Sequence, residues 1–459
     1  MMLDTVRADM LRPYGGDVHV ENIEAMSRRG TRYDMAIAPG TYTLPSHLSL
    51  FVGKRPRSIP WLRNMGMKYS DMMTDPYLKK SRFASNDLTI ARVMEYFGYR
   101  SALFSNNPFV SEATGLASGF SFVSNIFIDE KLKSNKLHVN AILHLIQNDL
   151  SRKGLIKLAY AISSVIPDTK LDNMYLGMRK RLNRHFSREY GYYDLDKGAS
   201  KSNNMLEEYL KRNRDNRNFI FMNYMEGHEG YPTNLVTRDY VEQDKWLHMI
   251  GEASKEDLNA TKEAYKKRIE YLDGKVGQAM KIMKRNGILD DATVIISSDH
   301  GQAFMEHGHM FHNVYPYNEV ARVPLVIADF KSGKQVRVRE VVDEPFSLID
   351  LNRMIAGKNM DVKRQAVIND HIGITEVWDA YLLKLFRKRS ENADKVYRKK
   401  VEQDRQVTAI FYKNYKLMHH YGSRKDELYD LSNDMEEKNN IIDSKRGIAH
   451  QILAFNSSF

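Results

Sequence analysis

The order of apolar and polar positions predicts helices and strands that alternate along most of the chain. Between residues 262 and 301, apolar side chains recur every three or four positions, and an unbroken apolar run follows. The helical positions are Tyr265, Ile269, Leu272, Val276, Met280 and Met283. This spacing predicts a long helix that ends at Gly287 and a buried strand, 293–297, that ends before Asp299.

Earlier segments repeat this alternation. Residues 20–30 form an amphipathic pattern that closes on Gly30, and residues 86–107 suggest a capped helix followed by a strand that ends near Ser105. Residues 218–231 combine a buried strand with a polar loop. Continuous apolar strands between helices predict an α/β fold with a mostly parallel sheet and helices on both faces.

The length and the pattern together predict two domains. We expect a catalytic domain over 1–330, in which the helix-rich and strongly basic segment 129–217 is an insertion. We expect a small α+β domain over 331–459, because 405–420 and 426–434 have the pattern of antiparallel strands.

The start of the chain is unusual for this fold. Only three residues precede Asp4, which is short for a central strand, so we expect the first strand to begin further upstream. No secretory signal or membrane-spanning run is evident, and the location of the protein stays open.

Composition narrows the chemistry. The chain has no cysteine, which excludes disulfides, thiolate metal sites and cysteine nucleophiles. Its formal net charge of +11 favours an anionic partner. We expect no nucleic-acid partner, because neither zinc-ligand spacings nor an aromatic RNA-binding strand signature is present.

Several polar residues follow strand-like runs, where parallel sheets place their sites. Asp4 and the adjacent Asp299 and His300 offer oxygen and nitrogen ligands that suit Zn or Mn, and Ca less well. The alternative is that each aspartate only caps a turn. His228 lies in a polar loop between Glu226 and Glu229, for which simple solvation is the alternative.

A second group of polar residues lies near Glu306. His307, His309 and His312 fall within six positions after it, and three histidines beside an Asp-His pair suggest ligands or phosphate donors.

Thr43 stands at the start of a predicted helix, two residues before Pro45. A hydroxyl there lies at the positive end of the helix dipole, and a nearby cation would lower its pKa. Thr43 would attack phosphorus, while His228 and His312 hold oxygens or protonate the leaving group. The alternative is that Thr43 is the N-cap, and we expect it to fill both roles.

Taken together, these stretches resemble the sulfatase branch of the alkaline phosphatase superfamily. The similar motifs are LDTVRAD, APGTYTLPSHLSLFVGKRP, GYRSALFSNN, MEGHEGY, VIISSDHG with EHG and H after it, RVPLVI, and YKLMHH with ELYDLSNDMEEKNN. The resemblance implies an alkaline-phosphatase-like domain, a small C-terminal domain with a four-stranded antiparallel sheet and a helix, and a metal-dependent ester hydrolase or transferase. It implies the following site: Asp4, Thr43, Asp299 and His300 as metal ligands; Thr43, His228 and His312 as catalytic residues; and Asn106, His47 and His309 as substrate-binding residues.

The motif around Thr43 departs from the sulfatase pattern C/S-x-P-x-R. Thr43 replaces the residue that becomes formylglycine, and His47 replaces the arginine, so we expect no formylglycine. Asn106 or Asn107 replaces a family lysine. Two-zinc relatives carry an aspartate four residues before the histidine that aligns with His228, whereas this chain has Tyr224, so we expect one divalent cation unless Glu226 substitutes.

We therefore expect a phosphate mono- or diester hydrolase or transferase. One alternative is a sulfatase that acts without formylglycine, and another is a non-catalytic protein that binds anionic glycans. The substrate would be an anionic ester, on a glycan or a lipid headgroup. The basic runs 178–188 and 384–400 suggest solvated faces; the alternatives are guidance of a polyanion or peripheral contact with an anionic membrane. The oligomeric state stays open.

Overall fold

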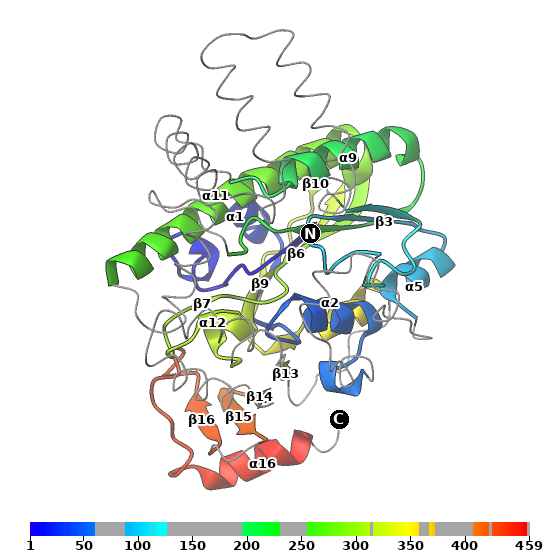
Figure 1. Cartoon of the computed structure of the whole chain (residues 1–459). Coiled ribbons are helices and arrows are strands. Elements are labelled where there is room, and N and C mark those ends of the chain that lie inside the picture. The colour runs from blue at the N-terminus through cyan, green and yellow to red at the C-terminus, as the bar shows by residue number, and fades with distance from the viewer. Residues whose placement is uncertain are drawn as a thin grey trace, which may run out of the picture.

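A ten-stranded, mostly parallel sheet forms the centre of the computed structural model (Figure 1). The structure describes residues 1–59, 88–112, 114–125, 195–229, 255–312, 315–357, 367–371, 407–421 and 425–456. The strands of this sheet are β1 (Met2–Leu3), β2 (Thr31–Ile37), β3 (Arg100–Ser105), β4 (Phe122–Asn125), β5 (Asn218–Tyr224), β6 (Asp291–Ser297), β9 (Arg322–Lys331), β10 (Lys334–Gln335), β11 (Glu340–Val342) and β12 (Phe346–Ser347). Their order is β11-β2-β9-β6-β1-β5-β3-β4, with β10 on β9 and β12 on β2. Among the described pairings, those of β9 are antiparallel and the others in this sheet are parallel. The predicted fold class is confirmed.

Helices cover both faces of this sheet (Figure 1). The helices are α1 (Glu21–Ser27), α2 (Thr43–Val52), α5 (Ile90–Tyr96), α9 (Ala199–Asn213), α11 (Lys255–Arg285), α12 (Asn318–Ala321) and α13 (Ile349–Ile355), with 3-10 turns at Arg12–Tyr14, Pro56–Ser58 and Ile288–Asp290. One apolar core joins α1, α9 and α11 to the sheet, and a second joins α2, α5 and α13 to the opposite face. The apolar stripe predicted on α11 is buried in the first core, and Gly287 follows this helix with a φ of 77°. None of the helices within the described residues is long and apolar enough to cross a bilayer.

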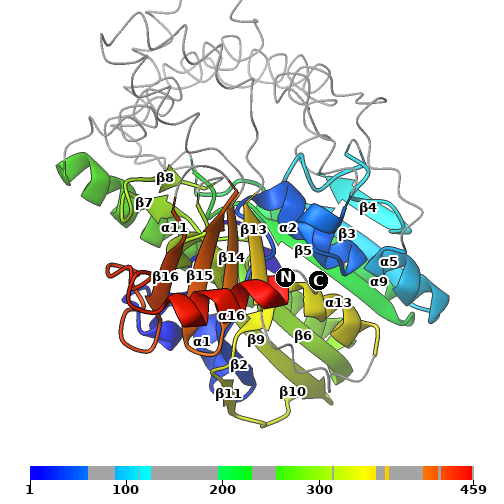
Figure 2. The ribbon, with the colours of Figure 1, turned by 90° about the horizontal axis from the view of Figure 1, so that it is seen from below.

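A smaller antiparallel sheet lies beside the large one (Figure 2). It consists of β13 (Val367–His371), β14 (Val407–Tyr412), β15 (Tyr415–His420) and β16 (Glu427–Asp430), in that order, and α16 (Arg446–Asn456) packs on it through an apolar cluster. A separate two-stranded pair joins β7 (Ala303–Phe304) to β8 (Met310–Phe311). This arrangement confirms the four-stranded sheet and helix that the resemblance implies.

The domain limits drawn from the sequence differ from this arrangement in one respect. Strands β10 to β12 and helix α13 all follow residue 330, yet they belong to the large sheet and its core. We therefore place the start of the small domain near β13. Of the expected insertion 129–217, residues 129–194 lie outside the described part of the chain, as do the basic runs 178–188 and 384–400.

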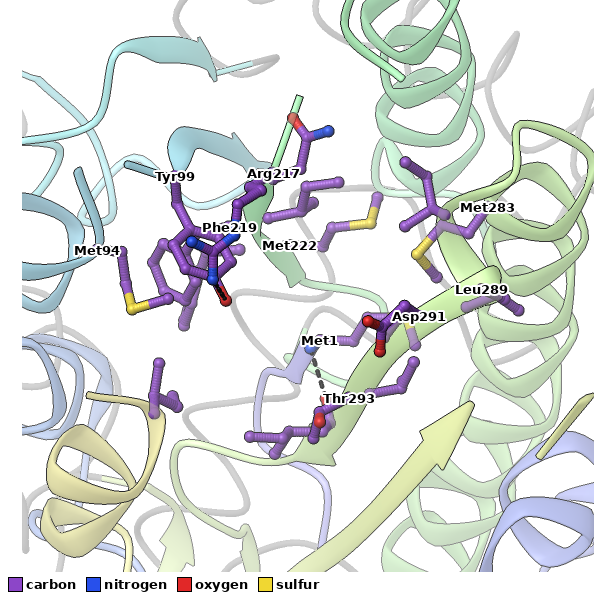
Figure 3. A pocket seen from close by; sticks show the side chains of 18 of the residues that line it. Met1, Met94, Tyr99, Arg217, Phe219, Met222, Met283, Leu289, Asp291 and Thr293 are labelled. Atoms are coloured by element: carbon purple, nitrogen blue, oxygen red, sulfur yellow. Dashed lines mark hydrogen bonds between the residues drawn. The ribbon is translucent and has the colours of Figure 1, made fainter. Parts of the chain in front are cut away.

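Strand β1 is two residues long although it lies in the middle of the sheet. Met2 pairs with Asn223 on β5 and with Ser297 on β6, so β1 reaches only the last residues of both neighbours. A cavity of about 660 Å³ lies between the amino ends of β5 and β6, and side chains of both strands are among those that line it (Figure 3). Asp4 and Asp299 follow the carboxyl ends of the strands, so this cavity is at the other edge of the sheet from the candidate site.

Candidate active site

Asp4, Thr43, Asp299 and His300 meet at the carboxyl edge of the large sheet. Asp4 follows β1, Asp299 and His300 follow β6, and Thr43 begins α2. All four residues are buried. Thr43 Oγ1 lies 3.4 Å from His300 Nε2. The same nitrogen lies 3.4 Å from Asp299 Oδ2 and 3.9 Å from Asp4 Oδ1. The structure thus brings together the four residues that the resemblance assigns to a metal.

The hydrogen bonds of the two aspartates leave room for a cation. Asp4 Oδ2 accepts from Asn107 Nδ2 at 2.7 Å, and Asp299 Oδ1 accepts from the backbone N–H groups of Thr5 and His300 at 3.2 and 3.0 Å. Asp4 Oδ1 and Asp299 Oδ2 are buried and have no donor. A buried carboxylate oxygen without a donor is costly, and a cation would satisfy both oxygens. With the His300 nitrogen they form a set of donors that fits a divalent cation such as Zn or Mn.

Burial shifts the protonation of this group. Burial, and next the nearby charge of Asp299, raise the pKa of Asp4 to about 7. Burial also raises the pKa of Asp299 to about 7 and lowers the pKa of His300 to about 4. His300 is therefore neutral at neutral pH. Its Nδ1 lies 2.9 Å from the carbonyl oxygen of Gly301, which favours a proton on Nδ1 and leaves Nε2 bare for a cation.

The backbone is strained next to Asp4. Thr5 has a φ of 61°, a left-handed conformation that a β-branched residue rarely adopts. This conformation directs the Thr5 N–H to Asp299, while Tyr265 Oη donates to the Thr5 carbonyl at 2.8 Å. Gly227 packs closely here, since a Cβ on it would lie 2.6 Å from the Asp4 carbonyl oxygen. Strain held by surrounding contacts is typical of functional sites.

The structure corrects the expected cap of α2. The N-cap is Tyr42, which makes no side-chain capping bond, and Thr43 is the first helical residue. The Thr43 hydroxyl instead contacts His300 Nε2 and, at 3.5 Å, Asn107 Nδ2. The side chain of Thr43 is therefore directed to the cluster of Asp4, Asp299 and His300, called the metal group below, and does not cap the helix.

Asn106 and Asn107 point to different places after β3. Asn107 Nδ2 donates to Asp4 and lies within reach of Thr43, while its Oδ1 accepts from the N–H of Phe109. Asn106 Oδ1 accepts from Ser202 on α9 at 2.5 Å. Asn107, which the sequence left as the second choice, is thus the asparagine within the metal group.

His47 lies beneath the group and is fully buried. Its Nδ1 lies 3.0 Å from the Thr43 carbonyl oxygen and 3.4 Å from Asp299 Oδ2, and its Nε2 lies 3.3 Å from Asn223 Nδ2. Burial lowers the pKa of His47 to about 3, so the ring is neutral. A neutral ring with its proton on Nδ1 donates to the Thr43 carbonyl oxygen and accepts from Asn223 at Nε2, while Asp299 Oδ2, at 3.4 Å, receives no hydrogen bond. His47 therefore links the start of α2 to β5.

His228, Glu229 and His312 form a second group beside the first. Glu229 Oε2 lies 3.1 Å from His228 Nδ1 and 3.2 Å from His312 Nδ1. The His312 ring lies 4.8 Å from the ring of His228 and 4.7 Å from the ring of His300, measured between centroids. His228 and His312, expected as catalytic residues, thus lie close to the metal group.

Three other residues considered from the sequence lie elsewhere. His309 packs against Tyr315 with a centroid separation of 5.1 Å, and His307 binds Glu319 at 2.7 Å. Glu226 Oε1 accepts the N–H groups of Lys197 and Ala199 at the start of α9. Glu226 is thereby engaged in capping a helix. His309, expected to bind substrate, belongs to a cluster of aromatic rings.

A comparison with protein families identifies the chain. The family model described as Sulfatase matches residues 1–357, which is more than three quarters of the sequence. The chain belongs to the sulfatase family. Members of this family use a divalent metal ion, and the group around Asp4 and Asp299 offers a site for one.

Curated relatives of this sulfatase-family chain match it weakly. A choline-sulfatase of Rhizobium meliloti is 36% identical over 77 residues, which is 17% of this chain and 15% of that protein. An N-acetylglucosamine-6-O-sulfatase of Bacteroides thetaiotaomicron is 21% identical over 96% of this chain and 82% of that protein. The chain thus matches well under two thirds of the length of the first of these relatives.

Solved structures share the fold. One is a phosphonate monoester hydrolase of Agrobacterium radiobacter. Its alignment spans all of this chain and 94% of the hydrolase chain, with 16% identity and a TM-score of 0.62. Another is a protein solved with its substrate D-glucosamine-2-N,6-O-disulfate. Its alignment spans all of this chain and 96% of that protein's chain, with 15% identity and a TM-score of 0.53.

Two residues of this sulfatase-family site were not found from the sequence. Lys197 Nζ donates to the carbonyl oxygens of His228 and Glu229, at 2.7 Å each. Gln302 Oε1 lies 3.0 Å from His312 Nδ1. Neither residue stands in a motif, because one precedes α9 and the other follows the Asp-His pair by two positions.

Proposed function

We propose that this sulfatase-family chain hydrolyses or transfers phosphate mono- or diesters with Thr43 as its nucleophile. The observation that carries the proposal is the position of Thr43 Oγ1, buried and 3.4 Å from His300 Nε2 beside two carboxylate oxygens without donors. Threonine cannot give the formylglycine aldehyde, and the chain has no cysteine. An unmodified hydroxyl is suited to attack on phosphorus.

The residues divide the chemistry as follows. A divalent cation held by Asp4, Asp299 and His300 would lower the pKa of the Thr43 hydroxyl and balance the charge of the ester. Thr43 Oγ1 bonds to phosphorus and loses its proton to solvent, and the bond from phosphorus to the departing oxygen breaks. His312, or His228 beside it, gives that oxygen its proton. Water or an acceptor hydroxyl then takes the phosphoryl group from Thr43.

Turnover of matched substrates tests this function. We would compare p-nitrophenyl phosphate, bis-p-nitrophenyl phosphate, p-nitrophenyl phenylphosphonate and p-nitrophenyl sulfate with protein loaded with Zn or Mn. Thr43→Val keeps the shape of the side chain and should lower phosphoester turnover roughly 10³-fold or more, whereas Thr43→Ser should retain part of it. Acid quenching should trap phosphate on Thr43. Turnover that survives Thr43→Val would refute the role of the hydroxyl.

A second candidate is hydrolysis of sulfate esters without formylglycine. The names of the curated relatives favour it. The same substrate panel separates the two: sulfate turnover above phosphoester turnover, lost in Thr43→Val, would support the sulfatase. Protein that binds no divalent cation and turns over no substrate would support the third alternative, a protein that only binds anionic glycans.

A further inference from the structure

We propose that His228, Glu229 and His312 bind a second divalent cation, for which zinc is the best match. The proposal rests on the proposed function only for the cation's task, which is to hold an oxygen of the ester beside Thr43. The sequence predicts one cation, because Tyr224 stands where two-zinc relatives carry an aspartate. The carboxylate here comes from Glu229 instead, directly after His228.

The spacing of the three side chains matches a metal site. One ligand atom from each lies within 4.8 Å of the others. Tetrahedral zinc with bonds of about 2.0–2.1 Å separates neighbouring ligand atoms by roughly 3.3 Å. Glu229 Oε2 lies 3.1 and 3.2 Å from the Nδ1 atoms of His228 and His312. Two histidines and one glutamate are an established zinc set, and three protein ligands leave one position open for an ester oxygen or water.

The group is held in place by neighbouring residues. Lys197 Nζ binds the backbone carbonyl oxygens of both His228 and Glu229, which fixes the loop that carries them. Such an outer contact orients metal ligands before the metal arrives. Gln302 Oε1 lies 3.0 Å from His312 Nδ1, the atom that also faces Glu229, so a cation bound there would replace the proton shared with Gln302.

The charge of the whole site also favours a second cation. Asp4, Asp299 and Glu229 bring three negative charges when ionised, and Lys197, whose Nζ binds the His228–Glu229 loop, brings one positive charge when protonated. One divalent cation leaves this set neutral, whereas a second makes it positive and attracts an anionic ester. The competing explanation is a protonated histidine that shares a hydrogen bond with Glu229, without any metal.

Zinc content decides between these explanations without any turnover. Full-length protein would be stripped with a chelator, reloaded with Zn²⁺, dialysed and assayed for bound metal. We expect two zinc ions in the wild type, one in Glu229→Gln and one in Asp299→Asn. The matched control is His419→Gln, which breaks another His-carboxylate pair, with Asp426 at 2.9 Å, and should keep two ions. Retention of one ion by Glu229→Gln also verifies that this variant is folded.

Two results would overturn the proposal: one zinc ion in the wild type, or a second ion that survives Glu229→Gln. Failure here differs from failure of the proposed function. Two zinc ions without turnover of any phosphoester would refute the function and keep the site. One zinc ion together with phosphate trapped on Thr43 would refute the site and keep the function.

Discussion

Replacing Asp299 with asparagine should stabilise the metal-free protein while it removes the metal site. Asp299 Oδ2 is buried without a donor and lies 3.4 Å from His300 Nε2. An amide nitrogen at this place could donate to that bare nitrogen, while the amide oxygen could still accept from the N–H groups of Thr5 and His300. The substitution therefore removes a buried charge and adds a hydrogen bond.

The size and sign of the effect follow from the pKa of Asp299. Burial raises this pKa to about 7, whereas an unfolded aspartate titrates near ~3.9. Between these values the folded state holds more protons, so its stability falls as the pH rises through this window. A difference of about 3 pKa units corresponds to a loss of about 4 kcal/mol of stability in the wild type. This loss is complete above pH 7 and absent below about pH 4. The low pKa values of His300 and His47 make stability rise with pH. They do so in the wild type and in Asp299→Asn alike, so they cancel in the difference in stability between the two proteins.

Thermal unfolding with a chelator present measures this effect. A chain of this length loses about 1 kcal/mol of stability per degree near its midpoint, so Asp299→Asn should raise the melting temperature by up to about 4 °C at pH 8. The gain should vanish near pH 4, and added Zn²⁺ or Mn²⁺ should stabilise the variant less than the wild type.

The matched control is Asp273→Asn. Both oxygens of Asp273 accept backbone N–H groups at the start of α1, from Asn22 and Ile23 at 2.9 Å each. Burial raises the pKa of Asp273 as well, but the amide nitrogen of asparagine cannot accept either N–H group, so Asp273→Asn should gain less stability at pH 8 than Asp299→Asn. A lower melting temperature for Asp299→Asn at pH 8, or a gain that does not depend on pH, would refute the reasoning.

Three further predictions concern the metal group. Because its two aspartates have pKa values raised to about 7, metal binding at pH 6 should release protons and binding at pH 9 should not; titration calorimetry in buffers of different ionisation enthalpy checks this. Asn107→Ala should weaken metal binding roughly 10- to 100-fold while Asn106→Ala leaves it unchanged, and equal effects would contradict the geometry. Gly227→Ala should weaken metal binding because its Cβ would meet the Asp4 carbonyl, whereas Gly274→Ala, with open space on α11, should add about 0.5–1 kcal/mol of stability.

The sequence predicts the parts of this fold that depend on short-range periodicity. The stripe on α11 and the apolar run of β6 place Asp299 and His300 at a strand end, and parallel strand ends meet at one edge. Asp4 could be placed in the same way, although β1 has only two residues. The membership of β11 and β12 in the large sheet could not be predicted, because both pair with β2, about 300 residues earlier in the chain, and such pairing leaves no local pattern.

Side-chain direction in loops was also beyond the sequence. After β3 ends at Ser105, the loop alone decides that Asn107 points to Asp4 and Asn106 to Ser202. The same holds for Glu226 and Glu229, which stand three residues apart in one loop. One caps α9 and the other joins the histidines.

The departures from the sulfatase motif at Thr43 and His47 fit together. His47 is fully buried, its ring is 6.0 Å from that of Phe51 and 5.9 Å from that of Phe221, and it joins the Thr43 carbonyl to Asn223. An arginine could not share this space without displacing an aromatic ring, and a neutral His47 brings no fixed positive charge. Apart from Lys197 on the His228–Glu229 loop, such a site takes its positive charge from bound cations or from protonated histidines at its rim. This is the physical reason to expect that the anionic substrate binds only after the metal does.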